Sequence, residues 1–176
     1  MQIVLAQVFG IGGMILGVAS LQCRSNRNYF LFQETSGLLF TISFILFGAW
    51  SGALMNIYSM VRPEFLRREK FAKSKYTLLF LLSMLFLFSA IVFWYFKEAW
   101  YLILIVTVAQ MIGTILMWLQ NGKMIRIGQL CCVSPLWLLY NLLLAVPSIG
   151  GVLAELINVT SSIIALVRYR KVGFVK

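Results

Sequence analysis

Two asparagines and one glutamate lie within apolar stretches of this chain, where a polar side chain is unfavourable unless it finds a hydrogen-bond partner or water. Asn56 and Asn158 each lie in an apolar run, and Glu155 precedes Asn158 by three residues. Residues three apart share one face of a helix, and an amide donates and accepts hydrogen bonds at the same time. Facing one another across a cavity, the two asparagines would suit a solute that carries hydroxyl or amide groups.

The same residues also have structural explanations. Asparagine in a membrane can hydrogen-bond a neighbouring helix, and a carboxylate can satisfy a backbone group beside a water-filled vestibule. A charge at bilayer depth costs about 2.5–3.5 kcal/mol on insertion scales, so such residues usually face a cavity. Glu155 therefore predicts a cavity, with a cation or proton site as one use of it. Asn141, which follows Tyr140, is the fourth candidate and either reaches that cavity or links helices.

The composition places these residues in a membrane. Of the 176 residues, 61% are hydrophobic and 11% are charged, and the mean hydropathy is +0.92. Ordinary soluble domains are about half apolar and about a quarter charged, which excludes a soluble, a disordered or a disulfide-rich chain. At about 20 residues per spanning helix, the length leaves room only for short loops. We expect an all-α membrane protein.

Polar residues between the apolar runs divide the chain into seven predicted transmembrane helices. The third is short for a bilayer unless it extends through Leu66, is tilted, or lies against its neighbours in a locally thinned region. The seven helices are Ile3–Gln22, Tyr29–Gly48, Gly52–Pro63, Tyr76–Phe96, Ala99–Leu119, Ile127–Val146 and Ile149–Tyr169. Tight turns are expected near Trp50, at Lys97-Glu98 and at Pro147-Ser148, and a loop is expected over Asn121–Arg126.

Basic residues predict the orientation. With seven spans, 14 of the 15 basic residues fall on one side, including Arg62, which stands at the end of the third span and is counted with the loop after it. Only Lys97 falls on the other side. Because cytoplasmic loops carry the excess of Lys and Arg, the N-terminus is expected outside and the C-terminus in the cytoplasm. The net charge of +10 then reflects loops beside a lipid bilayer, and nucleic acid is not an expected partner.

Weak matches that occur in the same order indicate an internal repeat. Ala6–Gly10 in the first span resembles Ala109–Gly113 in the fifth, and Leu54–Ser59 in the third resembles Leu156–Ser161 in the seventh. The second match brings the two candidate asparagines into equivalent positions.

The repeat predicts the organisation of the chain. Residues 1–69 form a first three-helix repeat, 70–98 a basic loop and linker helix, and 99–176 a second three-helix repeat with a basic cytoplasmic tail. A single linker helix makes the two repeats parallel in the membrane. Parallel repeats are related by an axis along the membrane normal, and solutes bind near the bilayer midplane between them.

Polar and small residues in a particular order, spread from roughly Leu5 to Arg170, allow comparison with a known family. They are Leu5-Ala6-Gln7 with Gly10, Arg24 and Arg27, the stretch from Gly48 to Asn56, Tyr140-Asn141, Ser148-Ile149-Gly150-Gly151, Glu155 and Asn158. In these residues the chain resembles the bacterial inner-membrane protein family named after YgjV. The resemblance implies a multi-pass protein of the bacterial inner membrane and no particular substrate.

More distantly, the organisation is similar to that of SWEET sugar transporters and PnuC vitamin transporters, which are built as three plus one plus three helices. In SWEETs an asparagine on the third and one on the seventh helix line the solute pocket, and Asn56 and Asn158 match those positions. The chain departs from that wider group because the Pro-Gln motif is missing. Gly10 and Gly113 stand in the first and fifth spans, where the group has hinge prolines.

The predicted function is a membrane transporter or facilitator for a small polar, neutral solute. The predicted site residues are Asn56, Asn158, Asn141 and Glu155, and alternating access would arise from rocking of the two halves. The alternative is a non-transporting membrane subunit or regulator that binds another membrane protein through glycine-rich helix faces. A third reading is a lipid or ion handler that uses Glu155. A homo-oligomer stays open.

No enzyme is predicted. The chain has no His and no Asp, and its sequence has no nucleophile beside a base and no glycine-rich phosphate loop. Those are the groups that catalytic sites need in recognisable arrangements. No cofactor and no metal site is expected.

Overall fold

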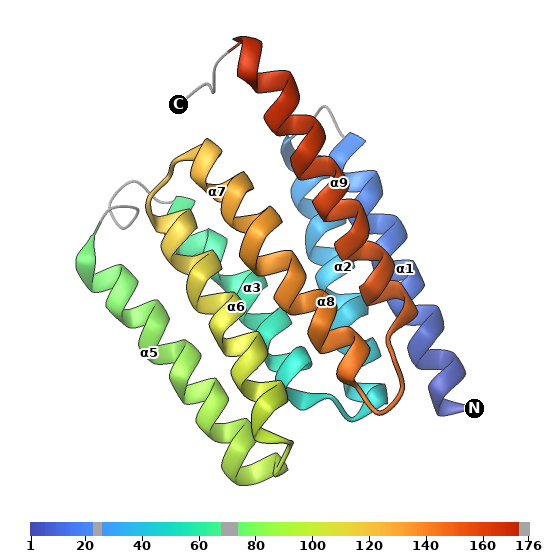
Figure 1. The fold of residues 1–176 in the computed structure, drawn as a ribbon. Coiled ribbons are helices and arrows are strands. Elements are labelled where there is room, and N and C mark those ends of the chain that lie inside the picture. The colour runs from blue at the N-terminus through green and yellow to red at the C-terminus, as the bar shows by residue number, and fades with distance from the viewer. Residues whose placement is uncertain (23–25, 68–73, 173–176) are drawn as a thin grey trace.

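The structure, a computed structural model, describes residues 1–22, 26–67 and 74–172, and all its regular elements are helices. They are α1 (Gln2–Gln22), α2 (Asn26–Phe47), α3 (Trp50–Arg67), α5 (Lys75–Ile91), η1 (Val92–Phe96), α6 (Trp100–Trp118), α7 (Gly122–Gly128), η2 (Gln129–Val133), α8 (Ser134–Leu143) and α9 (Ile149–Val172). The π-helix η1 continues α5, and η2 joins α7 to α8, so the described residues form seven rods (Figure 1).

Among the residues that the structure describes, three helices are long and apolar enough to cross a membrane, namely Gln2–Ala19, Lys75–Phe96 and Trp100–Trp118. Large apolar side chains cover the outer surface, and on α5 they include Leu79, Phe86 and Leu87, each more than half exposed. Such a surface suits hydrocarbon and would be unusual for a protein in water. The prediction of a helical membrane protein is therefore confirmed as far as its helices and their apolar surface are concerned.

Two boundaries differ from those predicted. The third helix, expected to end at Pro63 or to extend through Leu66, continues to Arg67 and contains that proline. The loop expected over Asn121–Arg126 is mostly helical, because α7 begins at Gly122. The side chain of Asn121 accepts hydrogen bonds from the backbone N–H groups of Lys123 and Met124, at 3.1 and 3.2 Å. This N-cap satisfies donors that the first helical turn leaves unpaired.

Short connections bring three pairs of helices together at one end of the molecule, at the bottom of Figure 1, here called the Glu98 end. The α2–α3 turn passes through Gly48 at φ 72°, and the α5–α6 turn begins at Lys97 with φ 52°. Residues in this left-handed conformation reverse the chain within a few positions. Glycine adopts such a conformation without strain, which favours glycine at position 48. The opposite end, where α7 begins, is called the Arg126 end.

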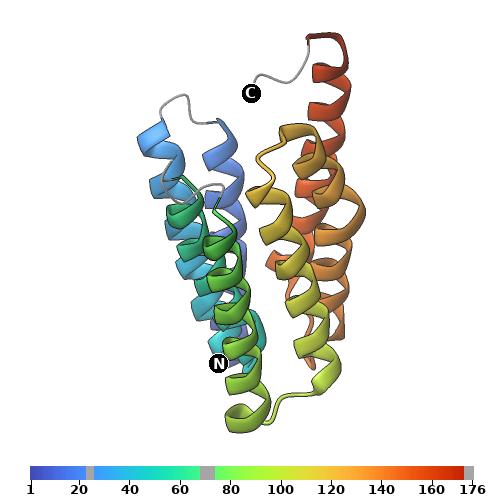
Figure 2. The same cartoon turned by 90° about the vertical axis from the view of Figure 1, so that its left-hand side faces the viewer.

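Six rods form a closed ring, in which α1 packs on α2, α2 on α3, α3 on α6, α6 on α8, α8 on α9, and α9 on α1. Helix α5 lies outside this ring, against α3 and α6. Figure 2 shows α1, α2, α3 and α5 as one group and α6 to α9 as another, joined at the bottom by the α5–α6 turn. The contacts between α1 and α9 and between α3 and α6 join the two groups.

The apolar core joins α3, α5 and α6 and continues to Phe44 of α2 and to Trp137 and Tyr140 of α8. Leu81, Leu85 and Val106 are completely buried there, together with Met55 and Tyr58 of α3. This packing fixes α3 and α6 against each other and leaves the polar side chains of the ring on its inner side.

The contact between α1 and α9 depends on glycine. A Cβ atom on Gly150 would overlap the backbone of Gly10 and Ile11. Within the first group, the hydroxyl of Ser43 donates to the carbonyl of Ala6 at 2.7 Å. Small residues therefore let three helices approach closely near the Glu98 end, as is common in membrane proteins.

Candidate functional site

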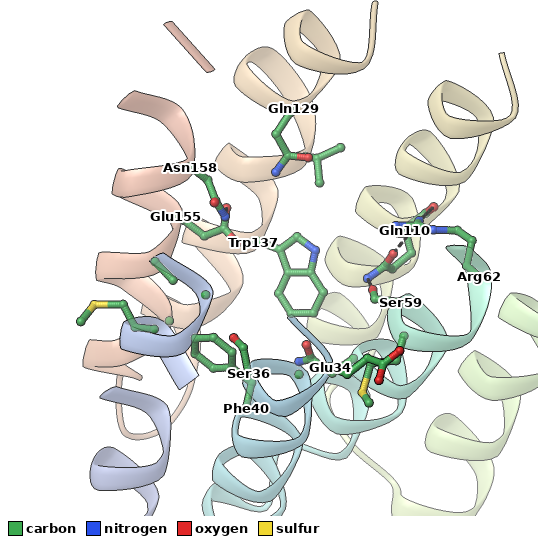
Figure 3. A pocket seen from close by; sticks show the side chains of 18 of the residues that line it. Glu34, Ser36, Phe40, Ser59, Arg62, Gln110, Gln129, Trp137, Glu155 and Asn158 are labelled. Atoms are coloured by element: carbon green, nitrogen blue, oxygen red, sulfur yellow. Dashed lines mark hydrogen bonds between the residues drawn. The ribbon is translucent and has the colours of Figure 1, made fainter. Parts of the chain in front are cut away.

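A cavity of about 490 Å³ lies inside the ring of helices. Its lining comes from α1, α2, α3, α6, η2, α8 and α9, while no residue of α5 takes part (Figure 3). The volume falls within the range of about 300–1,000 Å³ that is usual for small-molecule sites. The ring thus encloses space for a small molecule at the junction of the two helix groups.

All four residues predicted from the sequence line this cavity, namely Asn56, Asn141, Glu155 and Asn158. Each asparagine amide bonds within its own helix. Asn56 donates to the carbonyl of Gly52 at 3.1 Å, and Asn141 donates to the carbonyl of Trp137 at 2.8 Å. Their amide nitrogens therefore do not form the hydrogen bonds between helices that a purely structural role would require. That they bind a solute stays a prediction.

One wall of the cavity carries Glu155. Asn158 donates to its carboxylate at 3.4 Å, and Ser134 also forms a side-chain hydrogen bond with it. Gln129 of η2 in turn donates to the Ser134 hydroxyl at 2.9 Å. The wall is therefore a chain of polar groups that joins η2, α8 and α9.

The other wall carries a buried arginine that the sequence analysis counted with a loop. Arg62 lies inside α3 and is only 7% exposed, so the loop assignment is wrong. Its Nη1 donates to the side-chain oxygen of Gln110 at 3.0 Å and to the hydroxyl of Thr114 at 3.2 Å. The guanidinium also lies over the ring of Tyr58, 5.7 Å from its centre, as a cation–π contact requires.

Gln110 of α6 holds this second wall together. While its oxygen accepts from Arg62, its amide nitrogen donates to the hydroxyl of Ser59 at 2.5 Å and to the carbonyl of Met55 at 3.3 Å. Figure 3 places Arg62, Gln110 and Ser59 on one side and Glu155 on the other, with the indole of Trp137 between them.

In the part of the chain that the structure describes, two buried side-chain atoms have no hydrogen-bond partner, Nε of Arg62 and Oδ1 of Asn141. Both residues line the cavity. Buried polar groups in folded proteins are nearly always paired, so each exception calls for an explanation.

A hydrogen-bonded cluster closes the ring at the Glu98 end. The Glu98 carboxylate accepts from the backbone N–H of Ser51 at 2.7 Å and from its hydroxyl at 2.8 Å. The phenolic oxygen of Tyr140 lies 3.0 Å from that hydroxyl and accepts from the N–H of Gly52 at 2.8 Å. We call Ser51, Gly52, Glu98 and Tyr140 the closing cluster. It joins the start of α3 to α8 and to the α5–α6 turn.

The position of Glu98 perturbs its ionisation. Burial raises the pKa of this carboxyl above its ordinary value of 4.5, and the hydrogen bonds from Ser51 act in the opposite sense. A negative charge here also faces the positive end of α3. The sequence predicted only a turn at this residue and gave it no role.

A second contact closes the ring beside α1. Gln7 donates to the carbonyl of Pro147 at 2.8 Å and accepts from the N–H of Ile149 at 3.0 Å. With the Gly10–Gly150 approach, this ties α1 to the start of α9. At the other end the lining of the cavity reaches Glu34, whose side chain is exposed.

Some signals for the missed residues are present in the sequence. Tyr58 precedes Arg62 by one helical turn on the same face, and Gln110 is an amide within an apolar span. Neither signal says that the two helices meet. Among the described residues, no group of three His, Cys, Asp or Glu side chains could hold a metal ion.

Comparison with known proteins agrees with the apolar outer surface. A family model described as a bacterial inner membrane protein, Imp-YgjV, matches residues 4–172. No curated protein and no solved structure matches the chain. The family and the apolar helices locate the protein in the bacterial inner membrane. The chain belongs to the Imp-YgjV family of bacterial inner membrane proteins.

Proposed function

We propose that this protein moves a small polar solute across the inner membrane by exposing the cavity to each side in turn. The cavity itself carries the proposal. It lies between the two helix groups, its lining comes from both, and its polar residues include two with unpaired buried atoms. A membrane protein that needed only to pack would have little reason to enclose about 490 Å³ lined by asparagine, glutamate and arginine.

The moving parts in this proposal are two three-helix units, α1–α3 and α6–α9, with α5 as the linker. The ring supports this division, because the last helix of each unit packs on the first helix of the other, α3 on α6 and α9 on α1. That pattern is expected for parallel repeats about an axis along the membrane normal. Gln7 and Gln110, aligned in the sequence, make unlike contacts, so the repeat would be approximate.

The proposed orientation puts the Glu98 end outside the cell. Lys97 lies at that end, whereas Lys75, Lys123 and Arg126 lie at the other. Cytoplasmic ends of membrane helices carry the excess of basic residues. In this orientation the closing cluster and Gln7 seal the outer end, and the cavity faces the cytoplasm.

The glycine faces give less support to the alternative of a docking subunit. Gly13 packs against Phe40, Gly17 against Ser36, and Gly52 against Phe44. These faces are thus occupied within the chain. Among the described residues that line the cavity, there is no histidine or cysteine. We therefore propose binding and passage of the solute without chemical conversion.

Thiol labelling tests alternating access without knowledge of the solute. In a background in which Cys23, Cys131 and Cys132 are serine, Ala154→Cys places a thiol in the cavity lining. Its neighbour Leu153, 41% exposed on the outer surface of α9, gives the matched control Leu153→Cys. A charged, membrane-impermeant thiol reagent is applied to spheroplasts and to inverted vesicles.

The cavity thiol should react from both sides, faster from the cytoplasmic side, and the control thiol should react from neither. Adding Glu98→Gln and Tyr140→Phe should speed labelling from outside, because both changes weaken the closing cluster. A cavity thiol that reacts from one side only, with and without those changes, would contradict alternating access.

A further inference from the structure

An arginine and a glutamate stand on facing walls of the cavity. Arg62 belongs to the α3–α6 wall and Glu155 to the wall of α8 and α9, as Figure 3 shows. Within the described part of the chain, neither forms an ion pair with the other or with another residue. The hydrogen bonds of Arg62 go to Gln110 and Thr114, and those of Glu155 to Ser134 and Asn158, all of them neutral.

Such an arrangement is costly in an empty site. Arg62 is buried and Glu155 is half-buried. Buried charges are ordinarily paired, and removal of one partner from a buried pair is strongly destabilising. The lining also carries the carboxyl groups of Glu34 and Glu64, so Arg62 is the only cation among its described residues and Glu155 is the carboxyl group on the wall of α8 and α9. A ligand with two charges of opposite sign needs such an arrangement. Arginine is the residue best suited to a carboxylate, because its guanidinium matches that group in shape and charge.

We propose that the solute is a zwitterion of amino-acid size, with its carboxylate at Arg62 and its ammonium group at Glu155. The proposal rests on the transport function above and names the class of solute. It also retains the sequence-based expectation of a neutral solute, since a zwitterion carries no net charge.

The unpaired atoms of the site fit this assignment. The hydrogen bonds of Arg62 to Gln110 and Thr114 leave from Nη1, while its Nε–H is buried without a partner, so a carboxylate reaches it only after a small shift of the side chain. On the other side, Oδ1 of Asn141 is a buried acceptor without a partner, and it can accept a hydrogen bond from an ammonium group. Trp137, between the walls, offers an apolar surface for the carbon skeleton.

A purely structural role for Arg62 is the main rival. Its bonds to Gln110 and Thr114 join α3 to α6, so Arg62→Gln can weaken folding as well as binding. Two further variants separate these effects. Arg62→Lys keeps the positive charge without the planar fork, and Glu155→Gln leaves the α3–α6 contact intact.

The test is thermal melting of the purified full-length protein with four panels of compounds. The first contains L-amino acids; the second, the carboxylic acids that lack their amino groups; the third, the amines that lack their carboxylates. The fourth contains neutral sugars and amides. At least one amino acid should raise the melting temperature, and neither of its singly charged analogues should do so.

The shift in melting temperature should disappear in Arg62→Gln. The affinity derived from the shift should fall at least about tenfold in Arg62→Lys and by a similar factor in Glu155→Gln. The shift should survive in Lys123→Gln, which removes an exposed cation from the Arg126 end. If Arg62→Gln does not fold, the lysine and Glu155→Gln variants decide the matter alone.

Three results would overturn the zwitterion. They are no shift with any amino acid, an equal shift with the deaminated acid, and a shift that survives both Arg62→Lys and Glu155→Gln. Stabilisation by neutral compounds only would also overturn the zwitterion, but it would not contradict the proposed transport function. If an amino acid binds as expected but proteoliposomes do not exchange it, transport fails and the zwitterion site stands.

Discussion

The phenolic oxygen of Tyr140 lies 2.8 Å from the backbone nitrogen of Gly52, which joins α8 to the first turn of α3. Tyr140 is completely buried. A Cβ atom at position 52 would come within 2.6 Å of its hydroxyl, so the glycine makes room for the tyrosine. These two residues hold the two proposed units together at the Glu98 end.

Tyr140→Phe should loosen that end. The change leaves the buried N–H of Gly52 without its acceptor, which costs about 1–3 kcal/mol. We expect a lower melting temperature. Tyr101→Phe, at a tyrosine that is 43% exposed, is the control and should melt like the wild type. Equal melting of the two variants would mean that the Tyr140 hydroxyl does not hold α8 to α3.

Glu98 should make stability depend on pH. Because its pKa is raised in the folded protein, the folded state keeps this proton to a higher pH than the unfolded state. Its contribution to stability is therefore greatest below the ordinary value of 4.5 and falls as pH rises toward the raised pKa.

The measurement compares wild type with Glu98→Gln between about pH 4 and about pH 7. The difference in melting temperature, wild type minus variant, should fall as pH rises. All other carboxyl groups are present in both proteins and cancel. A difference that rises with pH would show that the hydrogen bonds from Ser51 outweigh burial.

Gly150→Ala should force α1 and α9 apart. The added methyl group would overlap the backbone of Gly10, which cannot move aside as a side chain can. Overpacking of this kind costs about 1–3 kcal/mol or more. Gly12→Ala is the control, because its methyl group would meet only the flexible end of Leu39. The two variants should differ clearly in melting temperature; similar values would argue against close packing at Gly150.

Replacing Asn56 and Asn158 together by alanine should remove binding and spare folding. Their amide nitrogens bond within their own helices, and hydrogen bonds in membrane proteins average about 0.6 kcal/mol. The panel solute that stabilises wild type most should lose at least about tenfold in affinity. Asn121→Ala removes an amide outside the cavity and is the control. Unchanged affinity in the double variant would exclude the asparagines from the site.

The apolar runs of the sequence predict the membrane helices, and the polar residues within those runs predict several residues of the cavity lining. Asn56, Asn141, Glu155 and Asn158 all line one cavity, because a polar side chain on a membrane helix turns inward whatever it contacts there. The same reasoning failed for Arg62. A basic residue beside a proline near the end of a span looks like a loop residue, and only the contact with Gln110 reveals it as part of a wall.

Contacts between distant segments explain the other omissions. The role of Glu98 depends on Ser51, which is 47 positions away, and no local pattern links a turn residue to the start of another helix. The start of α7 was missed for a different reason. Asn121-Gly122 is typical of a turn, yet the asparagine side chain caps a helix instead.

Alternation between the two ends is tested most directly by distances between spin labels in lipid bilayers. One pair, Val4 on α1 and Leu142 on α8, spans the units at the Glu98 end, and another, Ile15 on α1 and Ile127 on α7, spans them nearer the Arg126 end; all four side chains are exposed. We predict two populations for each pair, with the first distance lengthening and the second shortening in Glu98→Gln with Tyr140→Phe. A single, unchanged distance at both ends would contradict a cavity that opens to each side in turn.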